Sequence, residues 1–340
     1  MDSEFHYYIT YIIALRAGFK ADDAYTIAYS SQYTDDNDTP YEIMGDDVPY
    51  KNYISQTMDI TKPKEELLRI YPYFHFFPGS KREIVNNSYP RKDGKLHLLN
   101  TIPNNVNVRR LFTKSLRSAD LYRIGIATHT YADTFCHRDF VGWKDDFNLI
   151  KLKGLIAGVW SMVGPAIGHA LAMHTPDIPG LVWFDTRHVS SHVEVRNKDR
   201  ILVAAGNIFQ FYCEHCTKQR AVEKNRKKLV SELGEAIGEI SEEDNRTEER
   251  KKNYIDILKS ISKDAFKDYD EDAWFDEAVY YRPKAETVGT SRVENEYFRK
   301  LEFRNSDWFK FQEAVKFNQK LAESILNPLI SKLELQTDIW

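Results

Sequence analysis

The sequence predicts an all-α fold built as a single multi-helix domain, and two patterns carry that prediction. Apolar residues recur at helical spacing in several long segments, whereas the alternating runs typical of strands are sparse. No internal repeat, low-complexity tract or strong linker divides the 340 residues. With 42% hydrophobic and 29% charged residues, the chain has the composition of a globular protein that can bury a sizeable core. We therefore expect one domain over residues 1–340, in which residues 198–340 pack as helices around residues 1–180.

The N-terminal helices are predicted from their apolar faces and their stop signals. Phe5, Ile9 and Ile12 share a face that ends at Gly18, and Asp22 has the residue type of an N-cap. These signals place helices over residues 4–17, 23–33 and 64–70, a loop over 38–60 and an irregular stretch over 78–106.

The central helix is the clearest prediction, because Ser118, Ala119 and Asp120 can cap a helix that runs through His137. Residues 154–173 contain no Asp, Glu, Lys or Arg, which on length alone resembles a membrane span. Glycines, Pro165 and His169 interrupt that segment, so we expect a buried helix pair beside a functional site and no stable membrane insertion. Further amphipathic helices are predicted over 199–228, 241–267 and 306–327.

Charge and cysteine content narrow the class of protein. With 47 Lys and Arg against 51 Asp and Glu, the net charge of −4 gives no general basic excess for nucleic acid, although nucleic acid is not excluded as a substrate. Three cysteines are too few for a disulfide scaffold, and residues 1–4 lack the basic and apolar regions of a signal peptide. The expected location is the cytoplasm.

One ridge of the central helix has the pattern of a metal site. Four residues advance an α-helix by only about 40° beyond a full turn, so His129, Asp133 and His137 lie in one row. Imidazole and carboxylate groups are the usual non-thiolate ligands of catalytic zinc. The alternative is a helix whose His and Asp cap neighbouring elements or pair with Arg.

Residues elsewhere in the chain favour the metal interpretation. His6 and His75 stand among aromatic residues, where an unpaired imidazole would be costly. Asp35 shares the small-residue face of its helix, and Asp36 is turned about 100° away. A third group follows the apolar segment: His169, His174 and Asp177. Together these residues offer ligands for two or three metal ions.

The order of these segments resembles the zinc-dependent phospholipase C superfamily, which includes single-strand-specific nucleases. The resemblance rests on residues 29–35, 74–76 and 129–133. It implies an all-α fold that holds three zinc ions and hydrolyses phosphate esters. Over nearly the whole chain, the segments 4–8, 31–37, 129–133, 168–169, 176–177 and 306–311 more closely resemble a bacterial domain-of-unknown-function family, interpreted as a distant branch of that superfamily. The closer resemblance implies no activity.

The superfamily resemblance implies a role for each candidate ligand. One ion would be held by Asp35, His75, His129 and Asp133, and Asp133 would bridge to a second ion bound by His6. His137 and His169 would hold a third.

The chain departs from the superfamily pattern in three places. A processed N-terminal Trp supplies its amine and carbonyl in the superfamily, whereas this chain starts at Met1, so Asp2 or Glu4 would have to replace those ligands. The spacing from Asp133 to His137 is two residues shorter than the pattern. Met173 stands where an acid is expected, so His174 or Asp177 would complete the third site.

The function predicted from the sequence is a metal-dependent hydrolase of a phosphate ester that acts through a metal-bound hydroxide, as a phosphodiesterase of phospholipase C-like or nuclease-like type. Zn²⁺ is the expected cofactor, in two or three copies, and other divalent transition metals also suit these ligands. Asp35 is also the candidate general base. Phospholipid, nucleic acid and small phosphoesters are all compatible substrates. The alternative is a non-catalytic helical metal-binding protein that acts through a partner.

Overall fold

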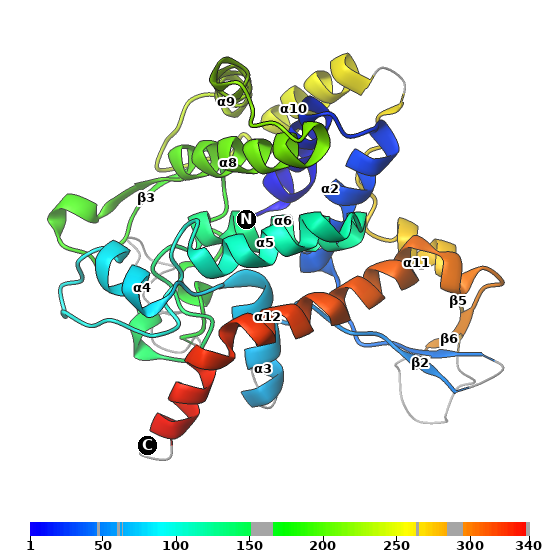
Figure 1. Cartoon of the computed structure of the whole chain (residues 1–340), viewed down its shortest axis with the longest axis horizontal. Helices are drawn as coiled ribbons and strands as arrows, with labels where there is room; N and C mark the ends of the chain where they lie inside the picture. Colours follow the sequence, from blue (N-terminus) through cyan, green and yellow to red (C-terminus); the bar gives the residue numbers. More distant parts are fainter. Residues whose placement is uncertain are drawn as a thin grey trace.

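The structure is a computed structural model that describes residues 1–45, 48–59, 62, 64–150, 166–262, 265–283 and 295–337. Most described residues are helical (Figure 1). The α-helices are α1 (Thr10–Ala17), α2 (Ala21–Asp36), α3 (Lys64–Ile70), α4 (Lys81–Asn87), α5 (Val106–Ser118), α6 (Leu121–Cys136), α8 (Asn197–Thr217), α9 (Glu223–Ile237), α10 (Thr247–Ser262), α11 (Ala273–Ala278) and α12 (Asp307–Thr337). The segment predicted as a buried helix pair, residues 154–173, lies outside the described residues except for its last part, which is irregular around a short turn at Ala170–Ala172.

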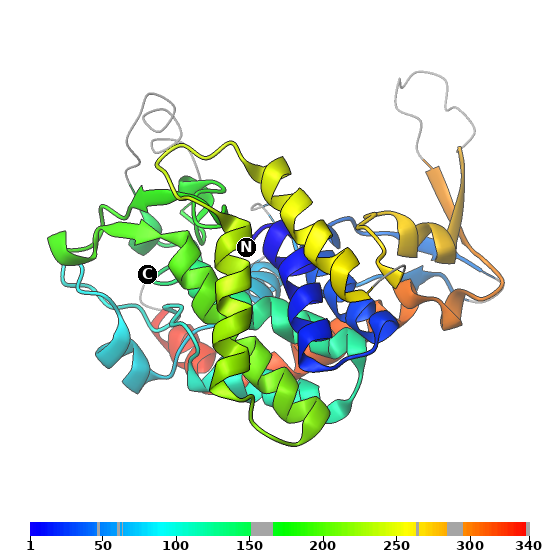
Figure 2. The same ribbon diagram turned by 90° about the horizontal axis from the view of Figure 1, so that it is seen from above.

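The fold is helix-rich but not strictly all-α, which corrects the predicted class. Strands β2 (Tyr50–Lys51), β1 (Glu42–Met44), β6 (Asn295–Arg299) and β5 (Val279–Pro283) form a mixed sheet in that order, and β3 (Val182–Phe184) pairs with β4 (Glu194–Arg196). The mixed sheet lies at one end of the molecule, where β5 and β6 extend away from the helices (orange in Figure 2). Strands of two to five residues are too short to show an alternating pattern in the sequence, which explains why they were not predicted.

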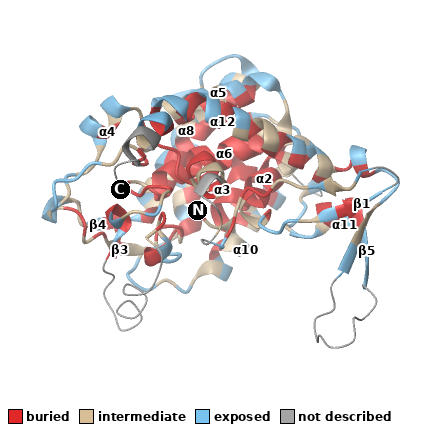
Figure 3. Ribbon diagram, turned by 90° about the horizontal axis from the view of Figure 1, so that it is seen from below, coloured by how far each residue is buried: buried red, intermediate tan, exposed pale blue. Residues whose placement is uncertain are grey.

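Helix α6 lies in the middle of the helical body. Figure 3 shows the buried residues concentrated around α6 and α2, and exposed residues on outer elements such as α4 and β5. Asp120 caps α6 by accepting a hydrogen bond from the Arg123 backbone at 3.1 Å, which confirms the predicted cap. Gly125 permits the close crossing of α2, because a Cβ at this position would lie 2.4 Å from the Ser30 Cβ.

Two short π-helical segments occur where the sequence predicted ordinary helix or its end. They are η1 (Glu4–Ile9), which continues into α1, and η2 (Tyr71–His75), which continues α3 past Pro72. A π-helical turn inserts one residue relative to an α-helix and therefore rotates the side chains that follow; such turns are frequent at functional sites. Here they carry His6 and His75.

The remaining helices partly follow the prediction. The predicted helix over 199–228 is interrupted at residues 218–222 between α8 and α9, and the one over 241–267 begins only at Thr247. Helix α12 continues past Pro328 because buried Leu329 and Ile330 extend its apolar face. Helices α4 and α5 were not predicted; α4 begins with a capping box in which Ser80 and Glu83 bond each other's backbone.

The C-terminal helices pack against the N-terminal ones. α8 contacts α1 and α6, α10 contacts η1 and α1, and α12 contacts α6 and α5. One cluster of buried hydrophobic residues draws members from Met1 to Ile330. Among the described helices, none is long and apolar enough to cross a bilayer; the cellular compartment stays a prediction.

Candidate metal centre

The predicted ridge on α6 is formed and is buried. The Nε2 atom of His129 lies 3.2 Å from Oδ2 of Asp133, and Nδ1 of His137 lies 3.6 Å from the same oxygen. None of the three side chains is more than 4% exposed. The row that the sequence predicts therefore lies at the centre of the core and not on a solvated face.

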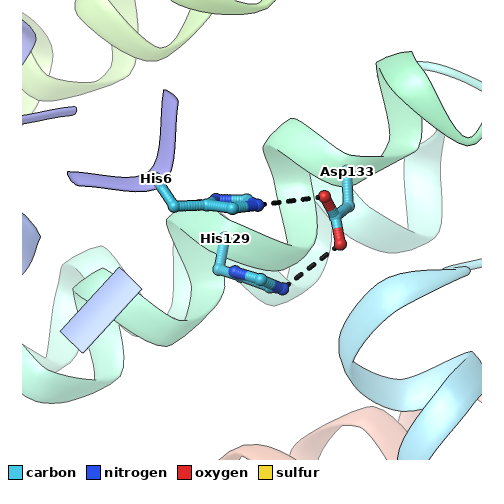
Figure 4. A group of neighbouring side chains, drawn as sticks. All are labelled: His6, His129 and Asp133. Atoms are coloured by element: carbon cyan, nitrogen blue, oxygen red, sulfur yellow. Dashed lines mark hydrogen bonds and ion pairs between the residues drawn. The ribbon is translucent and has the colours of Figure 1, made fainter. Parts of the chain in front are cut away.

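His6 joins this row from the N-terminal segment. Its Nε2 atom lies 3.2 Å from Oδ1 of Asp133, so the two oxygens of this carboxylate face different imidazoles (Figure 4). The His6 ring also stacks on the His129 ring, with centroids 3.9 Å apart. Asp133 therefore lies between two imidazoles, where the superfamily resemblance expects a bridging carboxylate.

Asp35 and His75 lie on the other side of Asp133. The Nδ1 atom of His75 lies 3.4 Å from Asp133 Oδ2 and 3.5 Å from Asp35 Oδ1. Asp36 turns away, as predicted, and accepts hydrogen bonds from Gln32 and from the Tyr269 hydroxyl. The Asp35 side chain is 24% exposed, which makes it the most accessible residue of the group.

A third group forms beside the end of α6. The Nε2 atom of His137 lies 3.2 Å from Asp177 Oδ1, and Nε2 of His169 lies 3.5 Å from Asp177 Oδ2. Of the two alternatives left open by the sequence, Asp177 completes this group. His174 is exposed and belongs to none of the groups found among the described residues.

Eight of the nine candidate ligands therefore form one cluster of neighbouring donor atoms, which we call the ligand pocket. It divides into three triads whose donor atoms lie within 4.8 Å of one another: His6, His129 and Asp133; Asp35, His75 and His129; and His137, His169 and Asp177. Each triad has the nitrogen and oxygen donors that divalent transition metals accept.

Backbone carbonyls fix the protonated nitrogen of four of these imidazoles. His129 Nδ1 donates to Ser31 O at 2.9 Å and His75 Nε2 donates to Ser55 O at 2.9 Å. In the same way, His137 Nδ1 donates to His75 O and His169 Nδ1 donates to Met173 O. The nitrogens that face the pocket are thus the unprotonated ones when the rings are neutral, which is the arrangement typical of metal-ligating histidine.

Two pairs of these unprotonated nitrogens face each other at short distance. His129 Nε2 and His75 Nδ1 are 3.0 Å apart, and His137 Nε2 and His169 Nε2 are 3.1 Å apart. Two lone pairs repel at this separation unless a cation or a proton lies between them. Two nitrogens that share a tetrahedral zinc at ~2.0–2.1 Å would be roughly 3.3 Å apart, so the observed geometry fits a shared metal ion.

Burial and charge keep the ligands in the forms that bind metal. Burial, with the positive charges of His129 and the Met1 amino group, lowers the pKa of His6 to about 3, and burial lowers that of His169 to about 4 although Asp177 opposes the change. Burial opposes ionisation of Asp133, but its interactions with His137, the Met1 amino group and His129 outweigh that effect and hold its pKa well below the usual range. At neutral pH His6 and His169 are therefore neutral and Asp133 is ionised, which are the forms that bind metal.

The two carboxylates expected to replace the missing N-terminal ligands do not lie in the triads, whereas the Met1 amino group lies beside them. The amino nitrogen of Met1 lies 2.5 Å from Asp133 Oδ1 and 3.3 Å from Asp177 Oδ1, between two of the triads. Glu4, proposed as a replacement ligand, instead pairs with Arg250, and Asp2 accepts a hydrogen bond from the Glu4 backbone. A backbone amino group carries no residue-type signal, which is why the sequence pointed to the carboxylates.

Phe76 is a further residue of the pocket that the sequence did not single out. Its ring stacks on His137 at 4.6 Å between centroids. Gly168, with φ of +50°, lies close to the tip of this ring, because a Cβ there would come within 2.3 Å of Phe76 Cζ. The glycine therefore allows the loop that carries His169 to approach the aromatic ring that fixes His137.

The fold and this pocket define a helix-rich protein with a buried His and Asp centre of metal-ligand type. The chain belongs to DUF6765, a family of unknown function, whose model matches residues 1–326. Comparison with curated proteins and with solved structures gave no match, so neither supports the resemblance to the phospholipase C superfamily.

Proposed function

We propose that this protein is a zinc-type metalloenzyme that hydrolyses a phosphate ester in the ligand pocket. The two pairs of facing imidazole nitrogens carry the metal-binding part of the proposal, because a shared metal ion would make both contacts favourable while all four rings stay neutral. The three carboxylates of the pocket add negative charge. Among the described residues, no Lys or Arg pairs with Asp35, Asp133 or Asp177.

Access to the pocket supports an enzyme. Asp35 and His169 are 24% and 19% exposed, whereas the other side chains of the pocket are almost completely buried. These two residues belong to different triads, so a phosphate ester would approach the centre beside one of them. Divalent ions held in the triads would bind its phosphoryl oxygens.

The imidazoles and the carboxylates of the pocket would have different roles in the reaction. Divalent ions held here would polarise the phosphate ester and acidify a bound water. The backbone carbonyls orient the imidazoles that would hold these ions. His129, His6 and His75 outweigh the effect of burial and lower the pKa of Asp35, so its carboxylate is ionised at neutral pH and can accept a proton from water.

The chemistry of the pocket does not choose among phospholipid, nucleic acid and soluble phosphoesters, since all three present the same phosphate group to the same ions. We therefore propose the class of bond that is hydrolysed, a phosphate ester, and do not propose a particular substrate. A fold resemblance is not a basis for choosing one of them.

The first test measures metal and turnover together. Protein that has never been exposed to chelator should hold at least two transition-metal ions per chain by elemental analysis. It should hydrolyse a chromogenic aryl phosphodiester slowly, with a rate that rises through roughly pH 6 to 8 as the metal-bound water ionises. Chelation should abolish the activity, and added Zn²⁺ should restore it.

A pair of neighbouring variants tests the role of Asp35. Asp35→Asn should reduce the rate while at least part of the metal stays bound, and Asp36→Asn, whose side chain faces Tyr269, is the matched control. Less than one transition-metal ion per chain would refute the metal centre itself. Loss of the same activity in both variants would refute the role of Asp35.

The near-complete burial of most ligands favours one alternative, a metal-binding protein without catalysis that acts through a partner. A saturated ligand shell is typical of structural sites, whereas an open coordination position is typical of catalytic ones. If fully metallated protein hydrolyses no phosphodiester, phosphomonoester, phospholipid or single-stranded oligonucleotide, this alternative replaces the hydrolase.

A further inference from the structure

Arg250 is a completely buried arginine in the first turn of α10. Its Nε and Nη2 atoms each donate to a carboxylate oxygen of Glu4 at 2.7 Å, and Nη1 donates to Asp244 Oδ2 at 2.5 Å. Its side chain is 1% exposed, and both carboxylates are fully buried. A guanidinium in this position is tolerated because it meets two carboxylates with directed hydrogen bonds.

The first carboxylate connects Arg250 to the segment that carries His6. Glu4 begins η1 and stands two residues before His6 in the same π-helical segment. Figure 2 shows α10, in yellow, beside the blue N-terminal segment, and the two elements are in contact. The bidentate pair fixes both the distance and the rotation of η1 relative to α10.

The second carboxylate connects Arg250 to the loop that carries Asp177. A Cβ at Gly180, three residues after Asp177, would lie 2.5 Å from Asp244 Oδ2 and 2.8 Å from Arg250 Nη1. The backbone of the same loop is bonded to the segment before α10, since Ser241 N donates to Gly180 O and Val182 N donates to Ser241 O. The Arg250 and Asp244 pair is thus packed directly on the Asp177 loop.

We propose that Arg250 is a positioning residue that holds the His6 and Asp177 segments at the separation their triads require. The proposal rests on the metal centre proposed above. His6 and Asp177 come from segments about 170 residues apart in sequence, and α10 is the element that touches both through one side chain. Metal ligands tolerate displacements of only about 0.2 Å, so a small shift of either segment changes ion binding.

The triad of Asp35, His75 and His129 provides an internal reference. Its residues lie on α2, η2 and α6, and no hydrogen bond or ion pair described for Arg250 or Asp244 reaches those elements. Loss of the Arg250 contacts should therefore weaken the two triads that contain His6 and Asp177 and leave this triad able to bind metal.

The test is a Zn²⁺ titration of apo-protein, followed by calorimetry, for wild type and two variants. Arg250→Lys keeps the positive charge but cannot bond both carboxylates at once. The matched control is Arg187→Lys. Arg187 is also buried and donates to both oxygens of Asp185, at 2.9 and 2.7 Å, and none of its described hydrogen bonds or ion pairs reaches a residue of the ligand pocket. Circular dichroism establishes the temperature at which each variant is folded.

We expect Arg250→Lys to bind at least one Zn²⁺ fewer per chain, or to bind its weaker class of ions at least tenfold more weakly, and Arg187→Lys to bind as wild type does. Wild-type stoichiometry and affinities in Arg250→Lys would overturn the positioning role, as would equal losses in both variants. If Arg250→Lys does not fold, Glu4→Gln tests the same ion pair, because it changes the carboxylate that Arg250 bonds. Failure of the wild type to bind Zn²⁺ would instead overturn the metal centre, a result that needs no variant.

Discussion

Two buried clusters of His and Asp lie in this molecule, and they differ in where their positive charge comes from. In the ligand pocket, imidazole nitrogens face one another and face carboxylates that no described Lys or Arg neutralises. In the second cluster, which consists of Asp139, Asp185, Arg187 and His188, Arg187 bonds both oxygens of Asp185. The second cluster thus contains an arginine that pairs with its carboxylate, whereas in the ligand pocket the Met1 amino group pairs with two of the three carboxylates and no described Lys or Arg pairs with any of them.

The distances within the two clusters are nearly the same, so distance alone does not identify a metal site. His129 Nε2 and His188 Nε2 each lie 3.2 Å from an Asp oxygen, and both imidazoles are fully buried. His188 Nε2 also lies 3.7 Å from Asp139, whose other oxygen accepts from Asn100. The lesson is that charge balance and the direction of each lone pair, not the number of His and Asp residues, separate a metal centre from a structural ion network.

The largest effect is expected from the residue that joins two triads. Asp133→Ala removes both oxygens that lie between His6, His75 and His129, so it should lose at least one metal ion per chain, whereas His174→Ala should keep the wild-type content. Loss of an ion bound at a thousandfold excess over its Kd costs about 4 kcal/mol, or roughly 6 °C in Tm for a chain of 340 residues. Elemental analysis and thermal melts measure both quantities.

Equal metal content and equal Tm in Asp133→Ala and His174→Ala would contradict the assignment of a metal centre to the ligand pocket. Removal of a central carboxylate would then have the same effect as removal of an exposed imidazole. His174→Ala is a suitable control since it removes an imidazole from the same loop as Asp177 without touching the triads.

The second cluster should respond to pH and not to metal. Burial opposes ionisation of Asp185, but the hydrogen bonds and charges of Arg187 and His188 outweigh it and hold its pKa well below the ordinary value. A carboxylate with a lowered pKa stabilises the fold above its unfolded-state pKa of about 3.9, and this contribution is lost as the pH falls below that value. Asp185→Asn should therefore cost about 3 kcal/mol at pH 7 by leaving Arg187 unpaired.

The Tm difference between Asp185→Asn and wild type should shrink as the pH falls below about 4, while the metal content at pH 7 stays that of wild type. A difference that grows toward low pH would contradict the assigned direction of the pKa. A loss of metal in this variant would show that the two clusters are not separate.

Sequence patterns predicted the ligand pocket better than its surroundings. The row on α6 and the choice of Asp35 over Asp36 follow from helical geometry, which fixes the direction of neighbouring side chains without any tertiary information. The short strands show no alternating pattern, and the mixed sheet also depends on β1 lying next to β6, more than 250 residues away. Arg250 and the Met1 amino group were missed for the same reason: their partners are set by packing between distant segments.

The sharpest comparison, with the smallest expected effect, changes one histidine in each cluster to glutamine. The amide of glutamine can still donate to a carboxylate, but it is not the imidazole that a zinc-type site requires. His188→Gln should keep all of its metal and lose about 1 kcal/mol, the net value of a typical hydrogen bond, since Arg187 continues to neutralise Asp185. His129→Gln should lose metal, because His129 belongs to two of the three triads. The test is metal analysis of both variants, made where each has the same folded fraction. Loss of metal in His188→Gln would mean that lone-pair direction and charge balance do not distinguish the two clusters. Full retention of metal in His129→Gln would mean the same.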